Sequence, residues 1–438
     1  MKERLFLKGK SRNLGISIVV ASLTMSLATV MQIGPSSGAP VTTIKVLSWE
    51  PGNAKFWKNT VAAFEKANPT IKVKMQNVPN NQYMQVQGPY ITSKSGPDIM
   101  ANNAGLEIAD RKSAYLPLPG SMLAIAKKNL VSYSGACLGF NPKNPCYGIP
   151  FSYQGNVMYY NKALLTKAGL DPENPPKTMA EFGVACKAIK ASGNTCLALG
   201  LQGQFPSYWD FPEIARNYLT EADMRSVLAG KMPWTNPKMV KVLQGLATVT
   251  SSGWTNTDAP SIAMLPDAAN LFSSGKAAFA GTIISDAVNW QAFGTALGDE
   301  NVGAMLWPTL VSNAPLANSF SGIEGSVYGV TAWSKNRAAS FKFLEWLAGP
   351  VHASLWVKDV GGISLYRNVD KKALPSSPAL AQILKIIAKP TLHVGVLLSS
   401  QETDALSRGW QQVALGEITV AEWTASMQAA LEASPSKQ

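Results

Sequence analysis

Apolar and polar positions along residues 156–169 predict a strand followed by a helix. Residues 156–160, Asn-Val-Met-Tyr-Tyr, are β-branched and aromatic, which is typical of a buried strand. The side chain of Asn161 can accept a hydrogen bond from a free amide of the next turn, so it predicts the start of a helix. Gly169 has the backbone freedom that helix ends require, and it predicts the end of that helix.

A second helix is predicted after a proline-rich turn over residues 171–176. Thr178 and Glu181 have the spacing of a capping box, in which each side chain satisfies a free amide of the first turn. Apolar residues then recur at every third or fourth position, as on the buried face of a helix, until Gly193. The residues on this face are Met179, Phe182, Cys186 and Ile189.

Similar patterns near the N-terminus predict a parallel sheet. Residues 43–49 alternate like a strand, residues 54–68 place apolar side chains on one side of a helix, and residues 71–76 form another strand. This strand–helix–strand order favours an α/β fold with helices on the faces of the sheet. Gly-Pro-Asp-Ile-Met over residues 96–100 predicts a third strand.

The ends of these strands are candidate ligand sites, because open α/β sheets bind ligands beyond the carboxyl ends of their strands. Aromatic and polar residues at or just after the first and third strands are therefore expected to contact a ligand. These candidates are Trp49, Glu50, Asn53, Asn102 and Asn103.

Length and composition indicate a globular protein with two domains. The chain has 438 residues, of which 46% are hydrophobic and 15% charged, and this balance excludes extensive disorder. The formal net charge is +12, but the first forty residues hold five Lys/Arg and one Glu, so about +8 remains beyond them. The remaining basic residues are scattered, so we expect no nucleic-acid partner.

The N-terminus predicts export from the cytoplasm. Basic residues precede an uncharged apolar run over residues 14–30 and small residues over 35–39, which is the pattern of a secretory signal peptide. We expect residues 1–40 to be removed, and the rival interpretation is a retained membrane anchor. This region has no cysteine to which a lipid could be attached. The predicted location is periplasmic or extracytoplasmic.

The four cysteines occur as two close pairs, Cys137 with Cys146 and Cys186 with Cys196. Exported proteins form disulfides, so we expect two local disulfides, although four cysteines allow three pairings. The spacings do not match a zinc site, and only His352 and His393 could assist. We therefore expect neither a metal nor another cofactor.

Four short motifs follow one another between residues 148 and 178. They are Gly148-Ile149-Pro150, Tyr160-Asn161-Lys162, Lys167-Ala168-Gly169-Leu170 and Pro175-Pro176-Lys177-Thr178. In this order they resemble the family 1 extracellular solute-binding proteins of ABC importers, the group of the maltose-binding protein. In that family the motifs mark the entry into the second of two lobes.

Two later segments extend the resemblance. Residues 272–279 are similar to the family's Phe-x-x-Gly-Lys-Ala-Ala signature, which turns from a helix into a buried strand. Residues 361–367 are similar to its Gly-x-x-Pro-x-Arg pattern, with Leu365 in place of the proline. Relatives often carry Gly-x-Trp soon after the first of these segments, with the Trp stacked on sugar. That ring is missing here, and Ser285 and Asp286 are the polar candidates in its place.

The resemblance covers about residues 43–432 and implies a two-lobed periplasmic-binding-protein fold. Each lobe is expected to be a mostly parallel sheet flanked by helices, and three hinge crossings are expected between the lobes. The expected crossings lie at 149–152, 321–325 and 361–366. The expected boundaries are 1–40 for the signal peptide, 41–150 and 321–362 for the first lobe, and 151–320 and 363–438 for the second.

Proteins of this family bind a solute between their lobes, close over it and deliver it to a membrane permease. The resemblance therefore implies a sugar or oligosaccharide ligand, permease subunits as partners, and a monomer. Aromatic rings stack on the C–H faces of a sugar, while carboxylates and amides bind its hydroxyls. The further candidates for these contacts are Tyr153, Gln154, Tyr208, Trp209, Asp210, Trp234, Glu324, Tyr366 and Arg367.

Two alternatives stay open. A phosphorylated polyol, such as a glycerol phosphate diester, would suit the basic balance of the chain and Arg367 at the third crossing. A secreted enzyme is the other alternative, because Ser273 and Lys276 match the Ser-x-x-Lys of penicillin-binding enzymes, and Glu50 with Asp210 could pair as in a glycosidase. The sequence lacks the Lys-Thr-Gly and Ser-Asp-Asn motifs that accompany Ser-x-x-Lys. We expect binding without catalysis.

Overall fold

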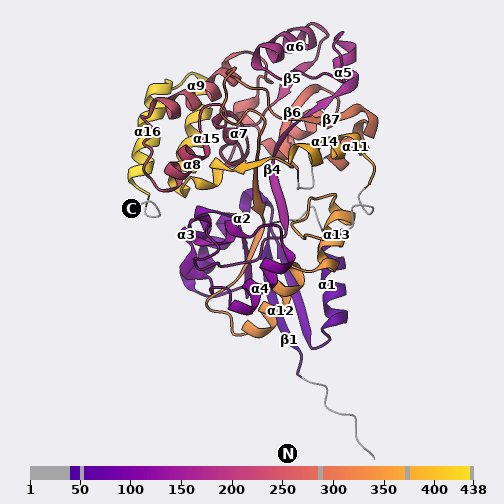
Figure 1. The fold of residues 1–438 in the computed structure, drawn as a ribbon, viewed down its shortest axis with the longest axis vertical. Helices are drawn as coiled ribbons and strands as arrows, with labels where there is room; N and C mark the ends of the chain where they lie inside the picture. Colours follow the sequence, from indigo (N-terminus) through magenta and orange to yellow (C-terminus); the bar gives the residue numbers. More distant parts are fainter. Residues whose placement is uncertain (1–39, 50–53, 285–289, 370–374, 435–438) are drawn as a thin grey trace, which may run out of the picture. The chain divides into compact units, whose positions relative to one another are not determined.

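The computed structural model describes residues 40–49, 54–284, 290–369 and 375–434. The predicted signal peptide lies outside this part of the chain, except for Pro40. The described strands form a four-stranded and a six-stranded sheet, and helices flank both (Figure 1). The expected α/β fold is therefore confirmed. In the same ranges, no helix has the length and apolar character needed to cross a membrane.

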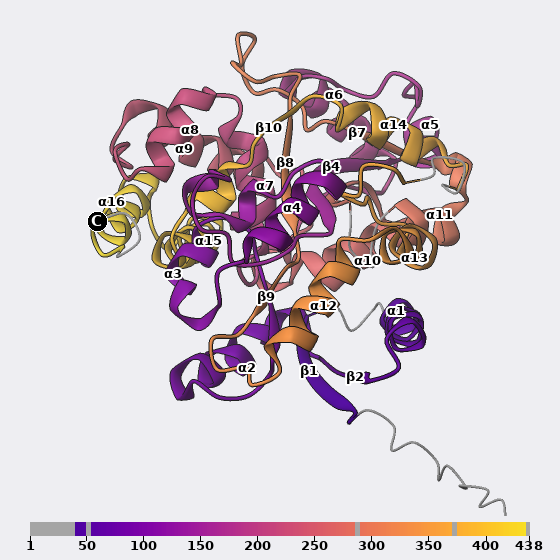
Figure 2. The same cartoon turned by 60° about the horizontal axis from the view of Figure 1, so that its bottom comes forward.

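The four-stranded sheet and its helices form what we call the first lobe. Its strands lie in the order β2-β1-β3-β9, with β1 parallel to β2 and β3, and β9 antiparallel to β3. Figures 1 and 2 both show α1 on one side of β1 and α2 on the other. The strands are β1 (Thr42–Ser48), β2 (Ile71–Asn77), β3 (Ile99–Asn102) and β9 (Val327–Val330). The helices are α1 (Ala54–Ala67), α2 (Asn80–Ser93), α3 (Leu106–Asp110), α4 (Gly120–Asn129), α12 (Arg337–Leu347) and α13 (Pro350–Val360).

Helix α1 is held by the apolar face that its sequence predicted. Phe56, Trp57 and Phe64 are fully buried in one core with strand residues Val46 and Ile99. Burying a side chain such as Phe contributes roughly 1.5–3 kcal/mol. This burial, rather than intrinsic helix propensity, fixes α1 against the sheet.

The six-stranded sheet and its helices form the second lobe. Its strands lie in the order β10-β8-β4-β6-β5, and β7 also pairs with β4. The strands are β4 (Ser152–Asn161), β5 (Thr195–Ala198), β6 (Ala277–Ile283), β7 (Val302–Met305), β8 (Phe320–Gly325) and β10 (Pro390–Leu392). The helices are α5 (Lys162–Lys167), α6 (Met179–Ala191), α7 (Phe205–Ala215), α8 (Glu221–Leu228), α9 (Pro237–Ser251), α10 (Ala269–Ser273), α11 (Trp290–Leu297), α14 (Pro378–Ile386), α15 (Ser400–Leu415) and α16 (Val420–Glu432).

One detail of the expected fold needs correction, because the second sheet is mixed rather than mostly parallel. Strand β4 runs antiparallel to β6, β7 and β8, whereas β5 is parallel to β6 and β10 is parallel to β8. The chain enters the second lobe along β4 and leaves it along β8, so these neighbours must run in opposite directions. Strand β9 continues from β8 into the first lobe, and it therefore runs antiparallel to its neighbour β3 there.

Three segments of the described chain cross between the lobes, as expected. Strand β4 starts at Ser152, shortly after Ile149 pairs with Tyr328 of β9. Strand β8 pairs with β4 and continues after one residue into β9. In the third crossing, Ser364 pairs with Ser152. The crossings therefore lie side by side, while the residue boundaries of the lobes stay predictions.

The local signals around β4 and α6 are confirmed. The side chain of Asn161 accepts a hydrogen bond of 3.1 Å from the Leu164 amide at the start of α5. Thr178 and Glu181 form the capping box at the start of α6. The predicted face of α6 buries Phe182, Cys186 and Ile189, and leaves Met179 half-buried.

The cysteines form the two predicted disulfides, and no free cysteine occurs in the described ranges. The bond between Cys137 and Cys146 closes a short loop of the first lobe. The bond between Cys186 and Cys196 ties α6 to β5. Each bond joins residues that are close in sequence, so each restricts a local loop of the unfolded chain.

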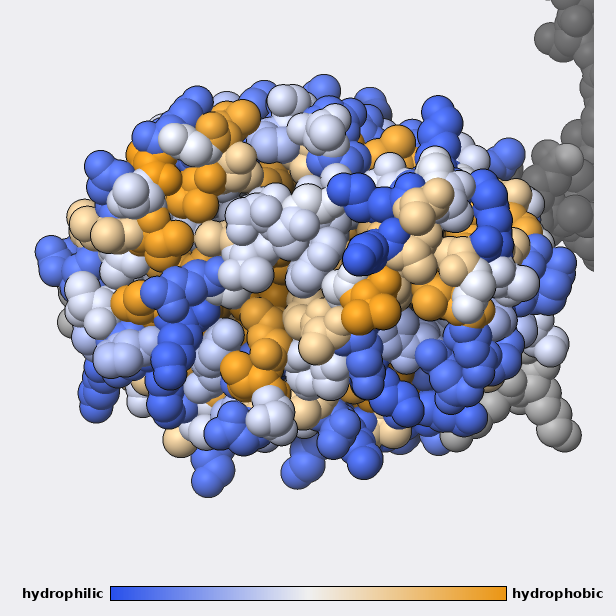
Figure 3. Space-filling model, turned by 90° about the horizontal axis from the view of Figure 1, so that it is seen from above, coloured by the Kyte–Doolittle hydropathy of each residue, from blue (hydrophilic) through white to orange (hydrophobic). Residues whose placement is uncertain are grey.

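The second sheet has an apolar core on each face. Met158 and Tyr160 of β4 belong to one core and Val157 and Tyr159 to the other, as the alternation of a strand requires. Helices α15 and α16 pack beside α7 and α9 at the first of these cores (Figures 1 and 2). On the face of the molecule seen in Figure 3, hydrophilic residues surround small groups of hydrophobic ones.

Candidate ligand-binding cavity

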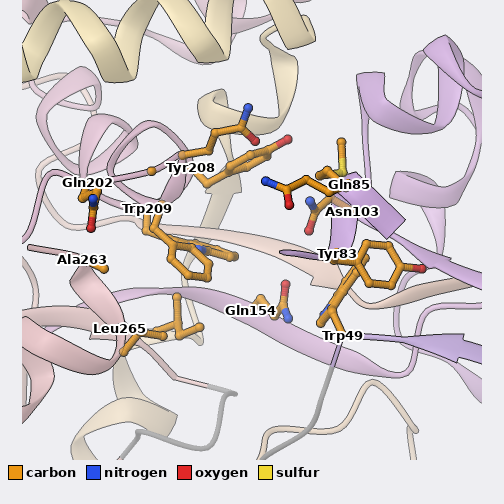
Figure 4. Close-up of a pocket in the computed structure, with 15 residues that line it drawn as sticks. Trp49, Tyr83, Gln85, Asn103, Gln154, Gln202, Tyr208, Trp209, Ala263 and Leu265 are labelled. Atoms are coloured by element: carbon orange, nitrogen blue, oxygen red, sulfur yellow. The ribbon is translucent and has the colours of Figure 1, made fainter. Parts of the chain in front are cut away.

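A cavity of about 280 Å³ lies between residues of the first and the second lobe (Figure 4). The first lobe contributes Trp49, Tyr83, Met84, Gln85 and Asn103. The second lobe contributes Gln154, Gln202, Gly203, Gln204, Phe205, Tyr208, Trp209, Ala263, Leu265 and Ile283. The wall therefore combines aromatic rings with side-chain amides.

The first-lobe wall is built at the carboxyl ends of β1 and β3. Trp49 follows β1, and its ring meets the ring of Tyr83 edge to face at a centroid distance of 4.9 Å. The Tyr83 hydroxyl donates a hydrogen bond of 2.8 Å to the carbonyl oxygen of Ala101 in β3. Helix α2 is thereby tied to the strand end, and both rings are held at the edge of the cavity.

The second-lobe wall is built on α7. Its first turn carries Phe205 and Pro206, and proline is well suited to this position because its missing amide has no partner there. Tyr208 and Trp209 follow and line the cavity. The Trp209 ring meets the buried ring of His393 edge to face at 5.3 Å. Burial lowers the pKa of His393 to about 3, so this imidazole is neutral.

Asp210 points away from the cavity and fastens α7 to β4. The side-chain amide of Asn156 donates to the Asp210 carboxyl group at 2.7 Å and to the carbonyl oxygen of Trp209 at 3.0 Å. Burial raises the pKa of Asp210 well above its usual range; the hydrogen bond from Asn156 opposes this shift, and the Glu213 carboxylate adds to it. Asp210 therefore positions its neighbours Tyr208 and Trp209 and does not line the cavity.

The C-terminal end of α7 is fixed by a buried arginine. Arg216 and Glu213 are fully buried, and the guanidinium Nε donates to the Glu213 carboxylate at 3.0 Å. A second guanidinium nitrogen donates at 2.6 Å to the carbonyl oxygen of Ala317, in the loop before β8. Burial raises the pKa of Glu213 to about 7, although the charge of Arg216 opposes the shift. The helix that carries Tyr208 is thus held in its middle and at its C-terminal end.

A carboxylate behind the wall connects the two lobes. Glu107 of α3 accepts a hydrogen bond of 2.9 Å from the side-chain amide of Asn103 and one of 3.3 Å from the hydroxyl of Tyr208. It also forms an ion pair with Arg111. Burial lowers the pKa of Arg111, but the Glu107 carboxylate, together with the nearby Tyr115, Tyr208 and Tyr83, makes the net shift upward. Burial and the charge of Glu107 raise the pKa of the Tyr208 phenol, while Arg111 and Asn103 oppose this rise.

Five of the predicted site residues come together at the cavity, from both lobes. They are Trp49, Asn103, Gln154, Tyr208 and Trp209. Four others, Glu50, Asn53, Ser285 and Asp286, lie outside the described residues.

The other predicted site residues lie elsewhere. Asn102 is buried and accepts a hydrogen bond from Tyr115, and Trp234 is a core residue whose indole donates to Glu402 at 2.9 Å. Glu324 is buried and accepts hydrogen bonds from the hydroxyls of Ser132 and Ser134. The predicted site residues that are described but do not line the cavity are Asn102, Tyr153, Asp210, Trp234, Glu324, Tyr366 and Arg367.

Several residues of the cavity wall were not predicted from the sequence. Gln202, Gly203 and Gln204 follow β5, so the rule for strand ends could have indicated them. Tyr83 and Gln85 belong to the first turns of α2, which follows β2 directly. Ala263, Leu265 and Ile283 are apolar, and no sequence signal separates such residues from core residues.

The described part of the cavity wall is uncharged. Of the described lining residues, none is Asp, Glu, Lys or Arg. The described parts of the chain also hold no group of three or more His, Cys, Asp or Glu placed to bind a metal ion. Ser273 and Lys276, the Ser-x-x-Lys pair, lie at the end of α10 and just after it, away from this wall. Ring faces suit C–H groups and amides suit hydroxyls, so the described wall is equipped to bind a ligand that carries both.

Comparisons with known proteins concern the sequence and the fold. Residues 59–382 match the family model described as "Bacterial extracellular solute-binding protein". The sn-glycerol-3-phosphate-binding periplasmic protein UgpB of Shigella dysenteriae is 27% identical over 226 residues, which are 48% of this chain and 47% of UgpB. The chain thus spans about half the length of the curated relatives it matches.

Solved structures show the same fold. One comes from work on xylan utilization by the thermophilic bacterium Caldanaerobius polysaccharolyticus, with a TM-score of 0.78, 22% identity, and coverage of 88% of this chain and 99% of that one. Another is a chitin oligosaccharide binding protein, with a TM-score of 0.78, 16% identity, and coverage of 90% and 99%. At these identities the likeness concerns the fold, which confirms the expected two lobes.

Proposed function

The chain belongs to the bacterial extracellular solute-binding proteins, and we propose that it binds a neutral sugar or short oligosaccharide in the cavity between its lobes. The observation that carries this proposal is the composition of the wall. Trp49, Tyr208 and Trp209 offer ring faces, Asn103 and Gln154 offer amides, and the described part of the wall has no charged side chain.

Sugars present two kinds of surface, and the cavity has a counterpart for each. The C–H faces of a pyranose pack on aromatic rings, and its hydroxyls donate to and accept from amides. A volume of about 280 Å³ is at the small end of ligand sites, which favours one or two sugar rings over a long chain.

A phosphorylated polyol is the second candidate ligand, because UgpB is a relative by sequence. A phosphate group needs cationic or multiple N–H donors around it. Arg367 is exposed and lies outside the wall, and Arg111 is paired with Glu107. The described residues therefore favour a neutral ligand. Support for a sugar also comes from the fold shared with a chitin oligosaccharide binding protein.

The proposed mechanism is closure around the ligand. Trp49 and Asn103 are attached to the first sheet and Gln154 and Tyr208 to the second, so a bound sugar contacts both lobes only when they are close. A ligand shifts the equilibrium towards the closed form by its greater affinity for that form. The three crossings would serve as the hinge, and the closed form would deliver the sugar to the permease of an ABC importer.

The remaining parts of the proposal concern the setting in which the protein works. We propose that it is an exported monomer that acts in the periplasm or outside the cell, where its disulfides are stable. Its substrate leaves the site chemically unchanged. Incubation of the protein with oligosaccharides, followed by chromatography of the products, tests this statement, and cleavage of a sugar would contradict it.

A thermal-shift screen tests the ligand class. The panel contains neutral mono- and disaccharides, polyols, sugar phosphates and glycerol 3-phosphate, and titration calorimetry follows each hit. A ligand that binds only the folded state raises the melting temperature with its concentration. We expect neutral sugars to give the largest shifts. If anionic compounds alone stabilise the protein, the neutral-sugar proposal is wrong.

A further inference from the structure

The buried carboxylate of Glu107 contacts residues of both cavity walls without lining the cavity itself. Its oxygens accept from the amide of Asn103 at 2.9 Å and from the hydroxyl of Tyr208 at 3.3 Å, and they pair with the guanidinium of Arg111. Figure 4 shows Asn103 and Tyr208 reaching the cavity from opposite sides. One carboxylate thereby holds a first-lobe amide and a second-lobe phenol together.

Glu107 fixes the orientation of the Asn103 amide. A carboxylate only accepts hydrogen bonds, so Asn103 must turn its NH₂ group towards Glu107. The amide oxygen of Asn103 is then left for the cavity, which Asn103 lines. At this point the wall presents an acceptor, which a ligand hydroxyl can satisfy. An oxygen of a phosphate or carboxylate group is also an acceptor, so it would face the Asn103 oxygen without forming a hydrogen bond.

Glu107 also neutralises a cation next to the wall. A guanidinium nitrogen of Arg111 lies 3.3 Å from the sulfur of Met84, which lines the cavity. Without its partner, this half-buried cation would attract an anionic ligand across a short distance with little screening. The ion pair with Glu107 removes that attraction.

We propose that Glu107 determines the charge class of the ligand, by presenting the Asn103 oxygen to hydroxyl groups and by neutralising Arg111. This inference rests on the proposed function and extends it. Glu107 acts through its neighbours, so it is a positioning residue. It makes the cavity select neutral, hydroxyl-bearing ligands and reject phosphorylated ones of the same size.

Three variants of the full chain separate this role from a purely structural one. Glu107→Gln removes the charge and lets the amide of Asn103 rotate, and Arg111→Gln removes the cation but keeps the carboxylate. Asn103→Ala removes the acceptor together with the amide that donates to Glu107. Glu345→Gln is the control, because it causes the same change in net charge at a surface pair with Lys342, away from the cavity.

Calorimetric titrations use two ligands, each at low and at high salt. One is the neutral sugar that binds the wild type, and the other is glycerol 3-phosphate. Glu107→Gln should bind the sugar roughly tenfold more weakly, because the Asn103 amide can then turn its oxygen away from the ligand hydroxyl and one hydrogen bond to the sugar is lost. It should gain binding of glycerol 3-phosphate, and salt should weaken that binding. Arg111→Gln should keep rejecting glycerol 3-phosphate, and Glu345→Gln should match the wild type.

The outcomes distinguish the two proposals. A wild type that binds glycerol 3-phosphate and no neutral sugar overturns the proposed function, and this inference with it. A wild type that binds the sugar, with a folded Glu107→Gln variant of unchanged affinity and selectivity, overturns this inference alone. If Glu107→Gln does not fold, Asn103→Ala decides: a roughly tenfold loss of sugar affinity supports the role of the oriented amide, and unchanged affinity contradicts it.

Discussion

The side-chain amide of Asn156 in β4 donates a hydrogen bond of 2.7 Å to the carboxyl group of Asp210 in α7, and both residues are fully buried. This bond turns Asp210 towards the sheet while its neighbours Tyr208 and Trp209 face the cavity. Successive residues of a helix point in directions about 100° apart, so one helix can offer rings to a ligand and a carboxyl group to its own lobe.

The first prediction concerns Asp210. Its raised pKa favours the protonated carboxyl group, which asparagine resembles in shape and polarity. Asp210→Asn should therefore leave both the free energy of unfolding and the sugar affinity nearly unchanged. Asp210→Ala should lower the free energy of unfolding by about 1–3 kcal/mol, because the buried Asn156 amide loses its partner. Urea unfolding and calorimetry check both values. A folded Asp210→Asn variant that no longer binds ligand would show that Asp210 contacts the ligand after all.

The second prediction separates cavity rings from core rings. Trp49 belongs to the first-lobe core and also lines the cavity, whereas Trp234 is a core residue outside the cavity wall, and its indole donates to Glu402. Trp49→Ala should weaken sugar binding roughly tenfold or more, because ring burial of this size contributes about 1.5–3 kcal/mol. Trp234→Phe should lower the melting temperature and leave the affinity within error of the wild type. Unchanged affinity in Trp49→Ala together with weaker binding in Trp234→Phe would indicate that the sugar binds outside this cavity.

The third prediction concerns the disulfide between Cys186 and Cys196. This bond ties α6 to β5 and closes a short loop. Replacing both cysteines with alanine should lower the free energy of unfolding by about 2–3 kcal/mol, because the unfolded chain regains the freedom of that loop. Sugar affinity should not change, since neither residue lines the cavity. Denaturation curves with and without reductant check this, and identical curves would contradict it.

The fourth prediction concerns the pH dependence of stability. His352 is fully buried between the rings of Phe56 and Phe151, and burial lowers its pKa to about 3. The unfolded chain takes up a proton on this side chain below about pH 6.5, whereas the folded protein does not. The stability contributed by neutral His352 is therefore complete above that pH and is lost as the pH falls towards 3.

His352→Phe tests this sign. Between pH 7 and pH 5, the free energy of unfolding should fall by about 2 kcal/mol less in the variant than in the wild type. The reason is that the variant has no histidine at this position to be protonated on unfolding. His393 and Glu213 titrate in both proteins, so the difference between the two curves isolates His352. Equal slopes in both proteins would mean that His352 is protonated in the folded state.

The predictions from sequence succeeded where the cause lies within a few residues. The cap at Asn161, the capping box of Thr178 and Glu181, and both disulfides depend on neighbours that the sequence places close together. The crossings at Ile149 and Ser364 were expected from the family resemblance, and the pairing of strands confirms them.

The failures arose where contacts join distant segments. Alternation within β4 is consistent with parallel or antiparallel partners, so the mixed second sheet could not be predicted from it. The aromatic segment around Trp209 was recognised, but the side of it that faces the cavity depends on Asn156, more than fifty residues away in sequence. The contact between Glu107 and Tyr208 could not be predicted for the same reason, because the two residues belong to different lobes.

A co-crystal structure with the neutral sugar that gives the largest thermal shift tests the central claim most directly. We expect density for the sugar in the cavity, with a ring face against Trp49 or Tyr208 and a hydroxyl donating to the amide oxygen of Asn103. Both lobes should contact it. Density at another place on the surface, contacts from one lobe alone, or a sugar cleaved in the site would contradict the account.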